Sequence, residues 1–86
     1  MKRELAVLRA ILMQLDAAFP ASLPPEIIAD GLKLAGFEFS ARETARRLEY
    51  LEQKGMLELL PSRLFPPARR AKITAAGIDY LQGGVF

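Results

Sequence analysis

The sequence predicts a mainly helical domain with one small β-hairpin, in the order helix, helix, helix, strand, strand, helix. Apolar residues recur at helical spacing in three successive segments. Two short runs of alternating apolar and polar residues follow, and a loop with prolines at both ends joins them. The chain then returns to helical spacing after a threonine, a common helix cap.

The first helix is predicted from about Arg3 to Phe19. Its apolar positions are Leu5, Val7, Leu8, Ile11, Leu12, Leu15, Ala18 and Phe19. A helix that is apolar nearly all round is buried on more than one side. Two explanations remain open. The second side meets another subunit, with Leu5, Val7, Leu8 and Ile11 in the interface of a homodimer, or this helix is the central one of the monomer's core.

The second helix lies between prolines and a glycine. Pro20 ends the first helix, because proline is poorly tolerated in helix interiors. Pro24 and Pro25 open the second helix, where a missing N–H is harmless. Gly36 is its expected C-terminal stop.

The third helix is predicted over residues 40–54. Ser40 and Glu43 have the Ser-x-x-Glu spacing of a capping box, and Gly55 marks the end. The residues expected to be buried follow helical spacing; they are Ala41, Ala45, Leu48 and Leu51.

The hairpin and the last helix follow Gly55. Alternation at 57–59 and 70–73 predicts two strands joined by the loop 61–67, with Ala71 and Ile73 facing inward. Thr74 is expected to cap a helix from Ala75 to about Leu81.

Length and composition limit the possible functions. The 86 residues are expected to form one domain, 1–86, with 83–86 as a short tail. The chain has no Cys and no His, which excludes disulfides, Cys-based zinc sites and a Ser-His-Asp triad. No acid–base pair, phosphate-binding loop or metal-ligand set is recognisable, so we expect no enzyme activity, cofactor or metal.

No signal peptide or membrane span is recognisable. The first apolar stretch is interrupted by Arg9, Gln14 and Asp16 and is too short to cross a bilayer. We therefore expect a cytoplasmic protein without membrane association.

Two segments resemble the winged helix-turn-helix family. Residues 48–57 are similar to the L-x-x-L-x-x-x-G-hydrophobic ending of the recognition helix in winged-helix regulators. Residues 73–81 are similar to the [LI]-T-x-x-G-x-x-x-L segment that follows their wing. With the two earlier helices, the resemblance covers nearly the whole chain. It implies a winged-helix fold with the third helix as recognition helix and the hairpin as wing.

A narrower resemblance points to phage proteins. Short segments at 9–12, 34–36, 40–43 and 77–83, with the proline-rich entry to the second helix, are similar to small proteins of Mu-like prophages. Those proteins have no firmly assigned activity, so this resemblance implies an origin and not a function. The apolar wing tip, residues 64–67, departs from their pattern.

Positive charge is concentrated on the third helix and the hairpin. Residues 1–38 carry four cations and five anions, whereas residues 39–74 carry eight cations and four anions. In a winged helix these elements enter the major groove and contact the flanking phosphates. The candidate DNA-contacting residues are Ser40, Arg42, Thr44, Arg46 and Arg47 on the helix and Arg63, Arg69, Arg70 and Lys72 on the wing.

The helix cations also have a structural explanation. Glu43 and Arg47 are four residues apart, a spacing at which opposite charges pair on a helix surface. In that explanation the arginines only form a solvated, salt-bridged face. Arginine is nevertheless well suited to guanine and phosphate, because its guanidinium group donates two parallel hydrogen bonds.

Two functions are predicted. The first is a homodimeric transcriptional regulator of bacterial or phage type that binds double-stranded DNA, with helix 40–54 in the major groove and wing 61–72 on the phosphate backbone. The alternative is a winged-helix protein–protein adaptor, or a phage assembly or packaging accessory. Its partner surfaces would be the first helix and the wing tip, because Leu64 and Phe65 are large apolar residues in a loop.

Overall fold

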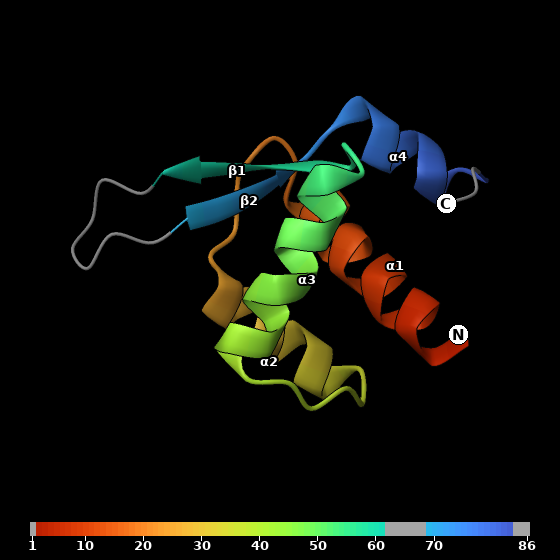
Figure 1. The fold of residues 1–86 in the computed structure, drawn as a ribbon. Helices are drawn as coiled ribbons and strands as arrows, with labels where there is room; N and C mark the ends of the chain where they lie inside the picture. Colours follow the sequence, from red (N-terminus) through yellow and green to blue (C-terminus); the bar gives the residue numbers. More distant parts are fainter. Residues whose placement is uncertain (1, 62–68, 84–86) are drawn as a thin grey trace.

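The computed structural model describes residues 2–61 and 69–83, and its elements follow the predicted order (Figure 1). The helices are α1 (Lys2–Ala18), α2 (Pro25–Leu34), α3 (Ala41–Gln53) and α4 (Ala75–Leu81), and the strands are β1 (Leu57–Pro61) and β2 (Arg69–Ile73). The prediction of a mainly helical fold with a small β-hairpin is thus confirmed. The order α-α-α-β-β-α is that of a winged-helix layout.

The predicted helix caps form. The side-chain oxygen of Ser40 accepts a hydrogen bond from the backbone N–H of Glu43, and the Glu43 carboxylate accepts one from the backbone N–H of Ser40, both at 3.1 Å. Thr74 Oγ1 accepts from the N–H of Gly77 at 3.3 Å. Gly55 ends α3 with a φ of 76°, a left-handed conformation that glycine adopts without steric strain. Local chemistry therefore fixes both ends of α3.

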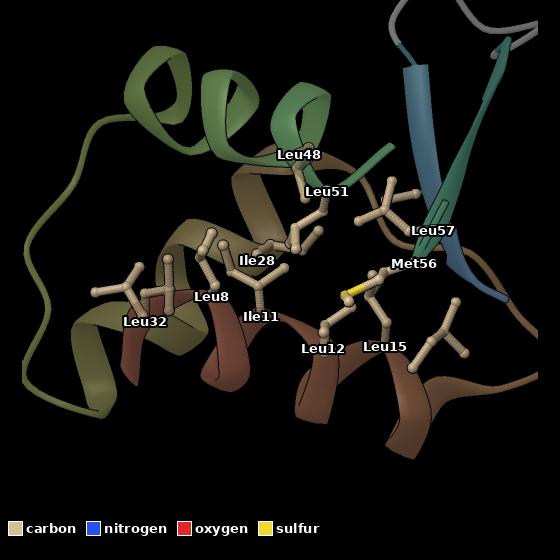
Figure 2. Packing of buried hydrophobic residues seen from close by; sticks show 13 residues of the cluster. Leu8, Ile11, Leu12, Leu15, Ile28, Leu32, Leu48, Leu51, Met56 and Leu57 are labelled. Carbon is tan, nitrogen blue, oxygen red and sulfur yellow. The ribbon is translucent and has the colours of Figure 1, made fainter. Parts of the chain in front are cut away.

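The core is built around α1, which packs against α2, α4 and β2. Figure 2 shows Leu8, Ile11, Leu12 and Leu15 of α1 facing the buried side chains of α2, α3 and the hairpin. Val7 and Ile11 are fully buried and Leu8 is 4% exposed. The explanation in which α1 is the monomer's central helix is therefore correct. The prediction that Val7 and Ile11 form a subunit interface is wrong, because the chain's own elements enclose them, and Leu8 keeps only 4% of its surface exposed.

The buried face of α3 differs from the prediction in one respect. Leu48 and Leu51 are buried as expected, but the third buried residue is Thr44, while Ala41 and Ala45 are half-buried. The helix is thus rotated so that the slightly larger threonine side chain, and not the alanines, faces the core.

The hairpin is antiparallel, with Leu57 opposite Ile73 and Pro61 opposite Arg69. Ala71 and Ile73 are buried, as predicted. The segment before α2 adds an unpredicted pair of hydrogen bonds to β2: Leu23 N–H donates to Ala71 O at 2.9 Å, and Ala71 N–H donates to Leu23 O at 2.8 Å. On β1, the N–H of Leu59 donates to the Glu52 carboxylate at 3.3 Å.

None of the helices within residues 2–61 and 69–83 combines the length and the apolar character that a bilayer crossing requires.

Candidate nucleic-acid interface

The interface starts from α3, which is held against the core by the side opposite its charges. Thr44, Leu48 and Leu51 fix the inner face, and the capping box fixes the first turn. Arg42 and Arg46 consequently lie on the exposed side, one helical turn apart. Neither forms a hydrogen bond or an ion pair with the residues that the structure describes. Their guanidinium donors are available to a ligand.

Arg47 is used inside the molecule. Its Nε lies 3.0 Å from Glu4 Oε1, and one terminal nitrogen donates a hydrogen bond to Glu4 Oε2 at 3.3 Å, so the two side chains form a hydrogen-bonded ion pair. The other terminal nitrogen donates to the backbone oxygen of Glu43 at 3.1 Å, and the guanidinium group stacks 4.0 Å from the centre of the Phe39 ring. Arg47 thus ties α3 to α1 and to the α2–α3 turn, and its charge is largely neutralised by Glu4. It does not fit the predicted role as a DNA contact.

Thr44 and Ser40 also differ from what was expected of them. Thr44 is fully buried and its hydroxyl has no hydrogen-bond partner among the described residues, so the prediction that it contacts DNA is wrong. Ser40 is exposed at the start of α3, but its hydroxyl oxygen already accepts the capping bond from Glu43. The Ser40 hydroxyl can still donate its proton, and its oxygen keeps one acceptor lone pair.

The cap changes the acidity of Glu43. The hydrogen bond from the backbone N–H of Ser40 is the largest cause that lowers the pKa of Glu43 below its ordinary value, followed by the bond with the Ser40 side chain. The positive charges of Arg47 and Arg46 lower the pKa further. Glu43 therefore stays ionised beside the two exposed arginines and reduces the net positive charge of α3.

The positively charged residues of the hairpin also differ in whether they are exposed or bonded within the chain. Arg69 is exposed. Arg70 instead donates from Nε to the Ser22 hydroxyl at 3.0 Å and from a terminal nitrogen to the Ser22 backbone oxygen at 2.8 Å. Lys72 Nζ lies 5.8 Å from the centre of the Phe19 ring. The predicted contacts Arg63, Leu64 and Phe65 lie outside the described residues.

An acidic depression of about 500 Å³ lies between α2 and the start of α3. Its charged lining consists of Glu26, Asp30 and Glu38 with Lys33, and Ser40 also lines it. These carboxylates form no metal-binding group within the described parts of the chain. They would repel a phosphate placed at the first turn of α3, which argues against the phosphate contact expected there. The exposed arginines are therefore the stronger candidates for contact with DNA.

A second depression of about 520 Å³, which we call the α1–α3 groove, lies between the N-terminal half of α1 and the outer side of α3. It is lined by Glu4, Leu5, Leu8, Arg46, Arg47 and Tyr50. Of the four interface residues predicted on the first helix, Leu5 is the exposed one, at 44%. The groove could not be predicted from the sequence, because the residues of α1 and α3 that line it are 38 or more positions apart along the chain.

Neither the protein-family models nor the curated proteins searched include a match to this chain.

Proposed function

We propose that this protein binds double-stranded DNA through α3 and the hairpin. The observation that supports the proposal best is the pair Arg42 and Arg46, two exposed arginines one turn apart that form no hydrogen bond or ion pair with the described residues. A structural, salt-bridged face would pair them with the acids nearby. Arg47 is an example of such a paired arginine, because it forms an ion pair with Glu4, whereas Arg42 and Arg46 form none with the described residues.

In the proposed complex α3 lies in the major groove, which is wide enough for a helix. Arg42 and Arg46 contact base edges or phosphates. Arg69 on β2 contacts the backbone, and Lys72 adds a further positive charge. The hairpin follows the C-terminal end of α3 and projects away from the helices, so it can reach a flanking phosphate (Figure 1). Arg47 and Arg70 support this arrangement by holding α3 and β2 in place.

The proposed role is regulation of transcription in the cytoplasm of a bacterium, by a protein of bacterial or prophage origin. A homodimer would place two α3 helices on half-sites separated by about one helical turn, roughly 34 Å. Leu5 and the outer side of α1 are the described surface on which such a dimer could form. Sedimentation with and without DNA tests this part of the proposal separately.

The DNA proposal is tested by titrating a random-sequence duplex at low and at physiological salt. We expect an affinity that falls steeply with salt, since phosphate contacts release counterions. The double variant Arg42→Ala/Arg46→Ala should weaken binding strongly. The matched control is Arg9→Ala/Lys33→Ala, which removes the same charge from α1 and α2 and should bind nearly as the wild type does. No binding at low salt, or an equal loss in both double variants, would refute the proposal.

A further inference from the structure

The α1–α3 groove brings apolar and charged side chains together, and the proposed function uses only Arg46, for DNA, and Leu5, for the dimer. Its mainly apolar lining residues are Leu5, Leu8 and Tyr50, which we call the apolar floor of the groove. Leu5 is 44% exposed and Tyr50 43%, although both are large and mainly apolar. Apolar surface gathered in a hollow favours a ligand that covers it, because water is then released from both partners.

The rim of the groove is positively charged. The one acidic lining residue, Glu4, is already paired with Arg47. Arg46 has no ion-pair partner among the described residues, and Lys54 Nζ lies 5.6 Å from the centre of the Tyr50 ring. A ligand in the groove would therefore contact apolar side chains next to positive charges. Acidic groups on the ligand would neutralise those charges.

We propose that the α1–α3 groove binds an acidic protein segment that carries a bulky apolar side chain. That side chain fills the hollow between Leu5, Leu8 and Tyr50, and neighbouring carboxylates contact Arg46 and Lys54. A nucleic acid would satisfy the cations but would leave the apolar floor uncovered. A basic segment would cover the floor but would be repelled at the rim. An acidic and apolar segment satisfies both.

Such a segment and DNA would compete, because Arg46 belongs both to the groove and to the exposed face of α3. This competition rests on the proposed DNA contact of Arg46. Binding of the segment itself does not, since it depends on Leu5 and Tyr50 as well. The groove would then link the binding of a protein partner to release of DNA.

The test is an NMR titration of the isotope-labelled chain with three synthetic peptides. The first is acidic and contains one leucine and one phenylalanine, the second has lysines in place of the acids, and the third has alanines in place of the two apolar residues. We expect the first peptide to bind and to shift amide signals around 4–8 and 46–54. The other two should bind at least several-fold more weakly. Equal binding of all three, signals shifted mainly on α2, or no binding at millimolar peptide would overturn the proposal.

Two pairs of variants identify the groove. Leu5→Ala should weaken binding of the acidic peptide about tenfold, as expected when an apolar contact at the centre of an interface is truncated. Leu34→Ala, at an exposed leucine on α2, is the matched control and should have no effect. Arg46→Glu should weaken the acidic peptide and strengthen the lysine peptide. Arg42→Ala should weaken DNA binding and leave the peptide unaffected, so failure of either proposal is recognised separately.

Discussion

The carbonyl oxygen of Met56 occupies the space in which a side chain at position 77 would have to lie. A Cβ on Gly77 would also come within 2.7 Å of Cγ1 of Ile73. Gly77 is buried where α4 packs on the turn that follows α3. The glycine of the segment 73–81 is therefore required by this close approach of helix and backbone.

Gly77→Ala should accordingly lower the free energy of unfolding by about 2 to 3 kcal/mol, because the clash is with backbone that cannot rotate away. Urea denaturation measures the change. The matched control is Gly31→Ala in α2, where a Cβ would meet only the end of the Gln14 side chain. There the Gln14 hydrogen bond to Ile28 O is lost, but about 1 kcal/mol of helix propensity is gained. An equal loss in both variants would contradict the packing argument.

Thr44→Val should leave DNA affinity unchanged and stabilise the chain by about 1 kcal/mol. The reason is that a buried hydroxyl without a partner is unfavourable and valine keeps the shape. Thermal unfolding and the DNA titration are measured on the same sample. Thr44→Ser is the control: it keeps the hydroxyl, removes a buried methyl group and should destabilise the chain. Weaker DNA binding by a stable Thr44→Val variant would restore Thr44 as a contact.

Arg69 and Arg70 should give different results despite being neighbours. Arg69→Ala should leave stability unchanged and reduce the salt dependence of DNA binding by about one phosphate contact. Arg70→Ala should cost about 1 kcal/mol of stability, because both hydrogen bonds to Ser22 are lost. Ser22→Ala removes only the hydroxyl acceptor and keeps both charges. If Arg70→Ala changed DNA binding alone, with normal stability, its bonds to Ser22 would be incidental.

Stability should decrease in acid as the α3 cap is lost. The pKa of Glu43 is lower in the folded chain than its ordinary value of 4.5, so the unfolded chain binds the proton more tightly. The contribution of Glu43 is complete above about pH 4.5 and disappears as the pH falls through the lowered pKa. Unfolding of wild type and Glu43→Gln, measured from pH 7 to pH 3, should converge at the acid end. Parallel curves would show that Glu43 does not contribute through its charge.

The sequence predicted α3 well because its end signals are local. The capping box and Gly55 act through bonds and backbone angles within a few residues, so their effect can be read from spacing. The bridge between Leu23 and Ala71 could not be predicted in this way. It joins positions 48 residues apart through a single pair, too short to leave an alternating pattern.

Periodicity also does not reveal how many neighbours a helix has. The broad apolar face of α1 fitted a subunit interface as well as a monomer core, and only the packing of α2, α4 and β2 shows that Val7 and Ile11 are enclosed within the chain. The same limit applies to long cations. Arg47 and Arg70 looked equivalent to Arg46 and Arg69 in the sequence. In the fold, however, Arg47 lies close enough to Glu4 to form an ion pair, and Arg70 close enough to Ser22 to form hydrogen bonds. Spacing does not show which arginine will be used internally.

The bond from Leu59 N–H to Glu52 bears on how the sheet behaves at high concentration. A strand at the edge of a sheet invites pairing with another molecule through its unused N–H groups. On β1 the Glu52 carboxylate occupies the N–H of Leu59 and places a negative charge there, while Leu23 covers β2 at Ala71. Loss of Glu52 would therefore leave the N–H of Leu59 on β1 free to pair with another molecule. Folded molecules would then aggregate through their sheet edges.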